Sequence, residues 1–571
     1  MMTNTLRETV NVAAYLTRMA EKRPYQRAVV VSAGRQANGY PAAYAHLTFR
    51  QLERETDCLA YGLDEMGIGR GMRTILMVQP SLEFFVIIFT LFKIGAVPVV
   101  VDPGMGIRRM MSCLAESKAA ALIGIPAAHL LKTFYPGFFK TVKHHVTVGR
   151  RWFWRGKSLA QLRKTPWQTF PVTDTQADET AAILFTTGST GPAKGAVYTH
   201  GIFDAQVRHI QSKFQIQPGE IDLPTFPLFA LFDPALGMTA VVPNMDPTKP
   251  AQVNPHNIIG PILHHGVTNM FASPALLNRV GRYGAKKNIQ LPTLKRVISA
   301  GAPALPQNLE RFSRMLNKEA QIFPGYGATE AMPVAVMGSH EILSETRKLS
   351  EQGFGICVGR AFDGLKVKII RISDNAIEHW SGDLELPSGE IGEIVVQGDV
   401  VTRRYFDRIR DDMMSKITEH DTFWHRMGDL GWMDKDGRLW FCGRKSHRVI
   451  TSRGTLYTVP CEAIFNNHPS VFRSALVGIG PKPEQQPVIC IELENPAGKK
   501  QRAKIETELH ALATSSVITQ SIRRILFHRS FPVDIRHNSK IFREKLAVWA
   551  EKKIAVASNR KARFRKSEKA V

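Results

Sequence analysis

The sequence predicts an α/β protein with a large N-terminal domain and a smaller α+β unit at its C-terminal end. Apolar runs alternate with amphipathic stretches from residue 45 to residue 340, as in sheets flanked by helices. From Gly389 the pattern changes to short strands joined by Asp-Gly turns, and after Gly443 a smaller unit extends to about residue 555. A chain of 571 residues is too long for one hydrophobic core, so at least two domains are expected.

The most apolar stretch, Phe84 to Val101, predicts a buried helix that runs into a strand. Lys93 and Pro98 interrupt it, so it falls short of the roughly 18 to 20 apolar residues of a membrane-spanning helix. A second helix is predicted after residue 199 by apolar residues on one helical face, with Thr199 as its cap. These residues are Phe203, Val207, Ile210 and Phe214.

Later elements follow from turn residues. Residues 297–303 predict a short strand that meets a turn, and residues 305–316 predict a helix. Residues 394–397, 429–433 and 438–441 predict strands, the last two joined across an Asp-Gly turn. The sequence shows no internal repeats.

The composition indicates a globular protein with an unusual charge. Hydrophobic residues make up 44% and charged residues 22%, while the formal net charge is +25. The electrostatic field of such a positively charged protein attracts ATP, anionic lipid, acidic proteins and nucleic acid without distinguishing them. No nucleic-acid-binding motif accompanies the charge, so nucleic acid is not expected as the main ligand. The N-terminus has no secretory signal, and six scattered cysteines favour a reducing compartment, so a cytoplasmic location is expected.

Two segments concentrate the positive charge. Residues 150–155 read Arg-Arg-Trp-Phe-Trp-Arg, and no acid occurs up to Lys164. This segment is either a solvated insertion or a surface that docks on a membrane or an acidic partner. The C-terminal residues 557–571 form a basic tail that is expected to be disordered.

Residues 183–200 carry the most specific chemistry. An apolar run enters a loop of glycines and hydroxyls that ends at Lys194, and a second β-type run follows. Glycines let a backbone approach a bulky anion, and hydroxyls with nearby N–H groups donate to phosphate oxygens. The loop is not a Walker A motif, since Lys194 lies between Ala193 and Gly195. The alternative is a flexible hairpin turn without a ligand.

Several further motifs occur in a family order. They are residues 297–303, Gly325-Tyr-Gly-Ala-Thr-Glu330, the strand 392–398, residues 428–432 with Gly443-Arg444, and Asn538-Ser-Lys540-Ile541. Together with the loop they resemble the adenylate-forming superfamily of acyl-CoA synthetases, luciferases and adenylation domains, over roughly residues 45–550. The resemblance implies a large adenylate-forming domain (1–444) of helix-flanked sheets with a small β-barrel-like subdomain, and a mobile C-terminal domain (445–556).

The resemblance also implies roles for individual residues, with ATP and Mg²⁺ as cofactors. Lys194 and the loop hydroxyls would hold the outer phosphates, Thr329 the α-phosphate, and Glu330 with Thr187 the magnesium ion. Tyr326 would stack on adenine, Asp429 would bind ribose, and Arg444 would reach ribose or phosphate. Lys540 would bridge the substrate carboxylate and the α-phosphate. The implied catalytic residues are Lys540, Thr329, Glu330 and Lys194. The implied nucleotide site comprises Thr186, Thr187, Gly188, Ser189, Thr190, Gly191, Lys194, Gly301, Ala302, Pro303, Gly325, Tyr326, Gly327, Thr329, Asp429, Arg444 and Lys540.

These residue types suit the reaction. A carboxylate must attack the α-phosphate, so two anions meet while pyrophosphate leaves, and the protein has to neutralise charge and fix geometry. The implied substrate pocket contains Phe229, Ala230, Phe232 and Ala328, and Ala230 replaces a histidine of many relatives. Ser446 stands where relatives usually have Asp or Lys at the hinge of the C-terminal domain.

The amino-acid sequences of residues 187–200 and 455–465 most resemble those of the olefin β-lactone synthetases of bacterial hydrocarbon biosynthesis. That resemblance implies a long-chain 2-alkyl-3-hydroxy fatty acid whose own hydroxyl expels AMP to close a β-lactone. It also implies possible association with other enzymes of the pathway. The base for the hydroxyl stays open, with His200 and Asp233 near the motifs. The alternatives are a long-chain acyl-CoA ligase and a basic scaffold with an inactive nucleotide fold.

Overall fold

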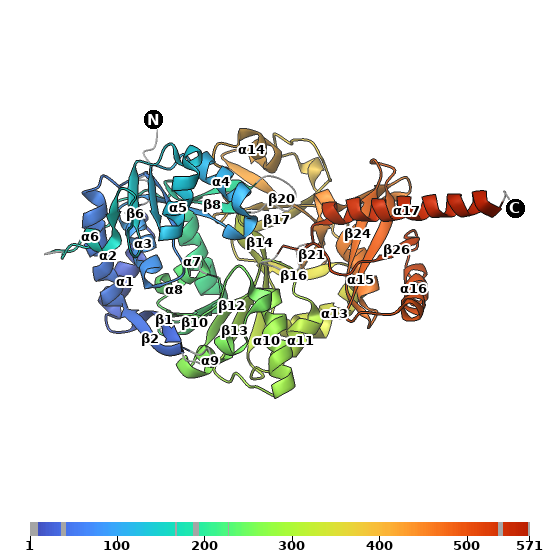
Figure 1. Cartoon of the computed structure of the whole chain (residues 1–571), viewed down its shortest axis with the longest axis horizontal. Helices are drawn as coiled ribbons and strands as arrows, with labels where there is room; N and C mark the ends of the chain where they lie inside the picture. The colour runs from blue at the N-terminus through green and yellow to red at the C-terminus, as the bar shows by residue number, and fades with distance from the viewer. Residues whose placement is uncertain are drawn as a thin grey trace.

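The computed structural model describes residues 9–35, 41–165, 168–186, 193–226, 228–534 and 541–568. Two large sheets form the N-terminal body, and two small sheets form a second unit at the C-terminal end (Figure 1). This mixed α/β architecture confirms the predicted fold class. No helix in these described ranges is both long and apolar enough to cross a bilayer.

The first sheet has seven strands in the order β7-β6-β5-β3-β4-β8-β9. All neighbours in it are parallel except the final pair, β8 and β9. Its strands are β3 (Arg73–Met77), β4 (Val97–Val101), β5 (Ala121–Gly124), β6 (His144–Thr147), β7 (Lys157–Ser158), β8 (Thr180–Thr186) and β9 (Lys194–Thr199).

The second sheet has 14 strands in the order β17-β18-β20-β21-β16-β15-β14-β13-β12-β10-β11-β1-β2, with β19 paired to β20. From β11 to β14 neighbouring strands are parallel, and from β14 to β21 they are antiparallel. Its strands are β1 (Arg27–Arg35), β2 (Pro41–Thr48), β10 (Ile221–Pro224), β11 (Thr239–Val242), β12 (Asn269–Ala272), β13 (Arg296–Ser299), β14 (Gln321–Ala328), β15 (Ala331–Val336), β16 (Ile356–Ala361), β17 (Lys366–Ile370), β18 (Gly392–Gln397), β19 (Lys416–Glu419), β20 (Thr422–Met433) and β21 (Leu439–Arg444).

The antiparallel strands from β15 to β21 take the place where a β-barrel-like subdomain is expected. They continue the large sheet, and the described strands do not close into a barrel. The predicted strand pair across Asp436-Gly437 is confirmed, because β20 and β21 pair in antiparallel register there.

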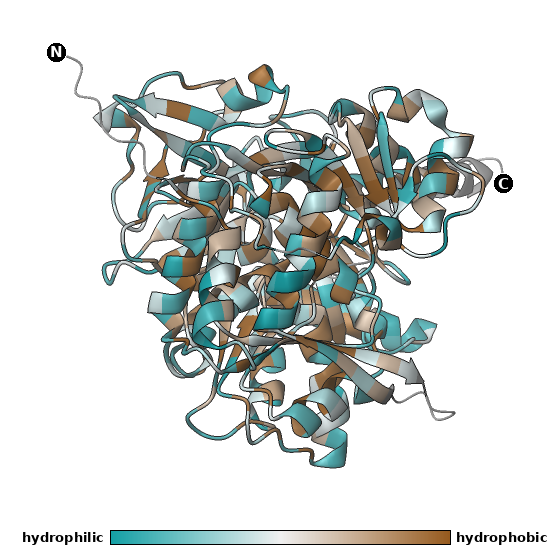
Figure 2. Ribbon diagram, turned by 90° about the vertical axis from the view of Figure 1, so that its left-hand side faces the viewer, coloured by the Kyte–Doolittle hydropathy of each residue, from teal (hydrophilic) through white to brown (hydrophobic). Residues whose placement is uncertain are grey.

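The helices lie in layers around the two sheets (Figure 1). One core joins both sheets to the first three helices, a second packs α9, α10 and α11 on the large sheet, and a third packs α4 on the seven-stranded sheet. The helices of the N-terminal body are α1 (Ala13–Lys22), α2 (Phe49–Asp64), α3 (Leu82–Lys93), α4 (Ile107–Glu116), α5 (Pro126–Phe134), α6 (Leu159–Leu162), α7 (His200–Phe214), α8 (Phe232–Ala235), α9 (His256–His265), α10 (Pro274–Lys287), α11 (Pro306–Ser313), α12 (Ser339–Glu341), α13 (Arg347–Glu351) and α14 (Ile409–Ser415). Figure 2 shows that many of these helices carry hydrophilic and hydrophobic residues on different faces.

Three sequence predictions of helices hold in this body. Helix α3 runs into β4 as expected, and Lys93 is buried there because its ammonium pairs with Glu53 at 2.7 Å and Asp57 at 2.6 Å. Helix α7 begins after Thr199, whose hydroxyl accepts the Ile202 N–H. Strand β13 is followed by α11, as the pattern of residues 297–316 predicts.

After Arg444 the chain leaves the large sheet and forms the second unit. Its strands are β22 (Val449–Thr451), β23 (Gly454–Leu456), β24 (Val471–Ile479), β25 (Gln486–Leu493) and β26 (Arg524–Phe527), and its helices are α15 (Thr458–Asn466), α16 (Lys499–Thr514) and α17 (Arg543–Glu568). The unit contacts the N-terminal body through Asn467, which donates to the Glu351 carbonyl at 2.8 Å, and through Glu494, which pairs with Arg282 at 2.7 Å.

The basic tail differs from its prediction. Helix α17 continues to Glu568 and projects from the second unit (Figure 1), so most of residues 557–571 is helical where disorder is expected. Lysine, arginine and alanine dominate this stretch. All three residue types favour helices, and this preference outweighs the repulsion between the positive charges. Residues 569–571 lie outside the described ranges.

A buried pair of carboxyl groups holds α8 against β10. Asp222 and Asp233 are both buried, and their side chains are hydrogen-bonded to one another. Burial raises the pKa of Asp222 to about 7 and the pKa of Asp233 well above its ordinary range. Two adjacent buried carboxyls cannot both ionise cheaply, so the pair retains a proton near neutral pH.

This pair predicts a specific pH dependence of stability. Because the folded protein binds the proton more tightly than the unfolded chain, the contribution is complete near pH 4 and is lost as the pH rises through 7. We expect the melting temperature to fall between pH 5 and pH 8, and Asp222→Asn to remove much of that slope. Between pH 5 and pH 7 the loss corresponds to about 3 kcal/mol of unfolding free energy, at about 1.4 kcal/mol per pH unit.

Differential scanning fluorimetry across this pH range measures the slope. Asp246→Asn serves as the control, since Asp246 is exposed and bonds only neighbouring residues, Thr248 and Lys249. Equal slopes for the wild-type protein and Asp222→Asn would contradict the assignment.

Candidate active site

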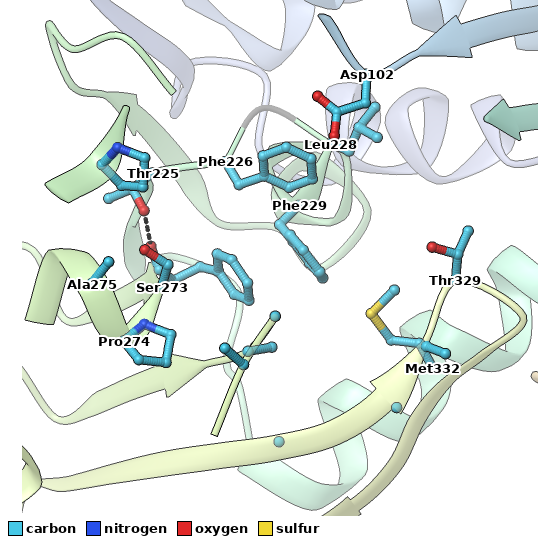
Figure 3. A pocket seen from close by; sticks show the side chains of 18 of the residues that line it. Asp102, Thr225, Phe226, Leu228, Phe229, Ser273, Pro274, Ala275, Thr329 and Met332 are labelled. Carbon is cyan, nitrogen blue, oxygen red and sulfur yellow. Dashed lines mark hydrogen bonds between the residues drawn. The ribbon is translucent and has the colours of Figure 1, made fainter. Parts of the chain in front are cut away.

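One continuous cavity of about 2330 Å³ lies between the two large sheets and reaches the second unit. Figure 3 shows part of its wall, with the rings of Phe226 and Phe229 on one side of an open space and Thr329 and Met332 on the other. Residues from more than ten strands and helices line it, so the fold brings together motifs that are far apart in the sequence.

The glycine- and hydroxyl-rich loop connects β8 to β9. These strands pair in antiparallel register, which sets Thr186 opposite Lys194 at the base of the loop. A side chain at position 195 would lie 2.8 Å from the Phe185 ring, so this position requires glycine. Five predicted phosphate ligands lie outside the described residues: Thr187, Gly188, Ser189, Thr190 and Gly191.

Lys194 lines the cavity and already has an anionic partner. Its ammonium pairs with Asp411 of α14 at 2.6 Å and lies 5.0 Å from the centre of the Tyr405 ring. Neither partner is recognisable in the sequence, because neither belongs to a glycine-rich or paired-carboxylate motif. Asp411 therefore balances the charge that is predicted to receive the outer phosphates.

Thr329 and Glu330 form the tight turn between β14 and β15, and both line the cavity. The Tyr198 hydroxyl donates to the Thr329 carbonyl at 2.6 Å, and the Thr402 N–H donates to the Glu330 carbonyl at 2.8 Å. The Tyr405 hydroxyl donates to Glu330 Oε1 at 2.7 Å. These bonds fix the turn from two other segments, β9 and residues 402–405, and so keep the Glu330 carboxylate in place.

Glu330 fits the role of a magnesium ligand. One oxygen accepts from Tyr405, while Oε2 accepts no hydrogen bond from any described residue. Among the described residues no group of three or more His, Cys, Asp and Glu side chains could hold a metal by itself. Magnesium held by one carboxylate and substrate phosphates needs no such group.

Two further ionisable residues lie behind this turn. The Lys416 ammonium donates to the Thr402 carbonyl, and burial lowers its pKa to about 7. His425 is buried on the cavity wall, and burial beside Lys416 and Lys194 lowers its pKa well below the ordinary range. The sequence offered no motif for either residue, and it is the pairing of β19 with β20 that sets Lys416 opposite His425.

The expected ribose pair is brought together by strand register. Asp429 in β20 lies directly opposite Arg444 in β21, and their side chains pair at 3.1 Å. The Tyr326 hydroxyl donates to the other Asp429 oxygen at 2.9 Å. All three line the cavity, so a buried carboxylate is held with a cation and a phenol beside it.

The predicted adenine-side residues lie next to this group. Gly301, Ala302 and Pro303 follow β13 and line the cavity, as do Gly325 and Gly327 of β14. Gly301 has φ +98°, a conformation that other residues rarely adopt. A side chain at position 327 would lie 2.8 Å from the Ala331 carbonyl oxygen, so the hairpin also requires glycine there.

The part of the cavity where the substrate's acyl chain is expected is apolar. Phe229, Phe232 and Ala328 line it, and Phe229 stacks on Phe271 with ring centres 3.8 Å apart. The structure places Ala230 elsewhere. Its side chain is buried in the core next to the phenylalanines and is not on the wall of this cavity, because the helical turn at 229–231 points it inward. The small side chain of Ala230 therefore does not enlarge the cavity in this conformation.

His200 and Asp233, the two open candidates for a base, do not line the cavity. His200 Nδ1 accepts the Val12 N–H, and burial lowers its pKa to about 4. Asp233 belongs to the protonated carboxyl pair described above. Their positions and protonation argue against either as the base.

The second unit contributes to the same cavity. Lys540 lies outside the described residues, but Ile541 and Arg543 beyond it line the cavity. Both oxygens of Glu462 accept from Arg543, at 2.6 and 2.7 Å, which ties the start of α17 to α15. Ser446 also lines the cavity, in the short helical turn after Arg444.

Comparison with known proteins agrees with this geometry. The sequence model of the family described as "AMP-binding enzyme" matches residues 16–406. The chain is 46% identical over 546 residues to an olefin β-lactone synthetase of Xanthomonas campestris pv. campestris, covering 95% of this chain and 97% of that protein. It is 45% identical over 547 residues to an olefin β-lactone synthetase of Stenotrophomonas maltophilia, covering 95% and 98%.

A solved structure of similar fold is the O-succinylbenzoate coenzyme A synthetase of Bacillus subtilis in complex with ATP and a magnesium ion. It has a TM-score of 0.71 and 20% sequence identity, covering 93% of this chain and 98% of that one. The family match extends over more than half of the sequence, and the named relatives match nearly all of it. The chain belongs to the AMP-binding enzyme family.

Proposed function

We propose that this protein is an ATP- and Mg²⁺-dependent β-lactone synthetase. Its substrate is a long-chain 2-alkyl-3-hydroxy fatty acid, which it first adenylates and then closes to a β-lactone with release of AMP. The observation that carries the proposal is the continuous cavity, in which Glu330, Asp429 and Arg444 share one space with apolar residues such as Phe229. The 46% identity to an olefin β-lactone synthetase supports the second half of the reaction.

In the first step the substrate carboxylate attacks the α-phosphorus of ATP and pyrophosphate leaves. Lys194, once released from Asp411, would bind the outer phosphates, and Glu330 would hold the magnesium ion, which would supply positive charge against them. Asp429 accepts the ribose hydroxyls, Tyr326 stacks on the adenine, and Lys540 bridges the two reacting anions. These roles follow the motif positions, and charge neutralisation of this kind is the main catalytic requirement.

In the second step the substrate's own 3-hydroxyl attacks the acyl carbon. A C–O bond forms to close the four-membered ring, the acyl–phosphate bond breaks, and AMP leaves. Since neither His200 nor Asp233 faces the cavity, we assign the hydroxyl proton to the phosphate of the departing AMP. The attack is intramolecular, so the protein mainly has to hold the conformer in which the hydroxyl reaches the carbonyl.

Division of labour between two domains is part of the proposal. Residues 1–444 form the adenylating domain and residues 445–556 a domain that moves about Arg444 to Ser446, carrying Lys540 into and out of the cavity. The protein acts in the cytoplasm, in contact with other enzymes of hydrocarbon biosynthesis. Affinity capture from hydrocarbon-producing cells tests the association with enzymes.

A product assay decides between the proposed function and an acyl-CoA ligase. Purified protein with ATP, Mg²⁺ and a long-chain 2-alkyl-3-hydroxy acid should release AMP and a β-lactone without coenzyme A. The lactone is identified by mass spectrometry and infrared absorption. A strict requirement for coenzyme A, with a thioester product, would overturn the proposal in favour of the ligase.

Replacing Lys540 tests the adenylation chemistry. Lys540→Ala should lower AMP formation about 100-fold or more, which is the usual loss when one group that stabilises transition-state charge is removed. Lys545→Ala is the matched control, since Lys545 is exposed on the same segment and lies over the Phe542 ring. Full activity of Lys540→Ala would remove Lys540 from the mechanism, and no pyrophosphate release by the wild-type protein would support an inactive scaffold.

Replacing Glu330 tests the magnesium site. Glu330→Gln keeps an oxygen that can accept from Tyr405 but removes the negative charge, so about tenfold more Mg²⁺ should be needed for half-maximal pyrophosphate release. The control is Glu341→Gln, whose carboxylate pairs with Arg360 outside the cavity. An unchanged Mg²⁺ requirement in Glu330→Gln would show that another group binds the ion.

A further inference from the structure

The seven-stranded sheet carries an unusually basic surface at its β7 edge. Between Glu116 and Asp174 the sequence contains ten lysines and arginines and no acid. Three of them pair with acids elsewhere in the N-terminal body: Lys118 with Asp407, Arg163 with Glu55, and Lys164 with Glu65. None of the other seven forms an ion pair with any described residue: Lys132, Lys140, Lys143, Arg150, Arg151, Arg155 and Lys157.

Within this surface the loop between β6 and β7 is anchored by one buried tryptophan. The Trp154 ring stacks on His129 of α5, with centres 5.3 Å apart and planes 9° apart, and its N–H donates to the Thr147 hydroxyl at 2.8 Å. Arg151 donates to the Trp154 carbonyl at 3.0 Å. The loop is thus tied to both α5 and β6, which lie side by side in Figure 1.

This anchoring leaves the neighbouring aromatic side chains exposed. Phe153 is 73% exposed and Trp152 is 50% exposed, although each ring contacts the anchored Trp154. Helix α5, which supports Trp154 through His129, ends at Phe134, which is 74% exposed. We call this surface the aromatic–cationic face, made up of Phe134, Tyr135, Phe138, Trp152 and Phe153 with Lys140, Lys143, Arg150, Arg151, Arg155 and Lys157.

We propose that the aromatic–cationic face docks on the surface of an anionic lipid bilayer. Exposing large aromatic side chains to water is unfavourable, so two adjacent exposed rings beside a buried tryptophan, with more exposed rings at the end of the helix that supports it, mark an interaction surface. Trp and Tyr place an apolar ring and a polar tip at the boundary of a bilayer, while Lys and Arg bind its anionic headgroups. A bilayer offers both environments in one plane, whereas an acidic protein surface accounts for the cations but not for the exposed rings.

The aromatic–cationic face lies close to the apolar wall of the cavity, so docking would bring the cavity near the bilayer. Helix α5 ends in the face at Phe134, and the same helix turns Ala127, Ala128 and Leu131 to the cavity. Ile107, on the neighbouring α4, lines the cavity and is 53% exposed. A long-chain acid held in the bilayer would therefore lie beside an apolar wall of the cavity. This use rests on the proposed function, whereas the docking itself does not.

Vesicle binding of the full-length protein without ATP tests the proposal. Sedimentation with vesicles of phosphatidylcholine containing 30% phosphatidylglycerol should show binding that 0.5 M NaCl weakens, since screening acts on exposed charges. The double substitution Trp152→Ser and Phe153→Ser should lower the partition coefficient at least fivefold. The control Tyr25→Ser, at a tyrosine that is 80% exposed between α1 and β1, should stay within twofold of the wild-type protein.

Circular dichroism and adenylation of a short-chain soluble acid confirm that each variant is folded. Equal binding of the double variant and the wild-type protein, or no binding of the wild-type protein, would overturn the proposal. Binding to immobilised polyglutamate but not to vesicles, lost in the same variant, would replace the bilayer by an acidic protein partner. None of these readings depends on lactone formation, so failure of the docking is distinguishable from failure of the proposed function.

Discussion

A carboxylate removed from water needs a compensating charge, and the pairing of Asp429 with Arg444 meets that need at the centre of this molecule. The register of β20 and β21 sets the two residues opposite one another, and Tyr326 adds a hydrogen bond from β14. Three strands of the large sheet thus converge on one acidic group. Because Arg444 is also the last residue of β21, the expected ribose site and the exit of the chain toward the second unit are the same place.

Lys445, the residue after Arg444, belongs to a second buried group of charges. Glu393 of β18 is fully buried and accepts from Arg426 at 2.7 Å and from Lys445 at 3.0 Å. Breaking a buried group of this kind leaves an uncompensated charge, which typically costs about 3 to 5 kcal/mol. Any rotation of the second unit about residues 444–446 must therefore keep Lys445 in contact with Glu393 or replace that contact. The strand 392–398, one of the motifs in family order, thus anchors the start of the second unit through Glu393.

The sequence predicted the parts of this protein that depend on local pattern. The apolar helix before β4, the Thr199 cap and the β20–β21 hairpin follow from spacing and turn residues, and the structure has them where they are expected. Glu330 and Lys194 were predicted from motif order. Their neighbours Tyr405, Asp411 and Lys416 were not, because these residues approach the site only through long-range contacts of the fold, which no local pattern encodes.

Two predictions differ from the structure for similar physical reasons. Ala230 was assigned to the acyl pocket from its position near a motif, but the direction of a side chain in a short helical turn depends on the surrounding core. The basic tail was expected to be disordered from its charge, yet its residues favour helix and α17 reaches Glu568. In both cases the prediction rested on sequence position or charge alone, whereas backbone conformation determines where the residue lies.

The pairing of cations with carboxylates also explains how a protein with a net charge of +25 keeps its candidate site stable. Lys194 pairs with Asp411, and Arg444 pairs with Asp429, so each of these two cations has a carboxylate partner within the protein. A phosphate group that took the place of Asp411 at Lys194, as proposed above, would replace one anion by another and keep this balance. The excess positive charge lies instead on surfaces such as the aromatic–cationic face, where water screens it. The molecule thus separates a charge-balanced interior from a cationic exterior, and it is the exterior that attracts anions at long range.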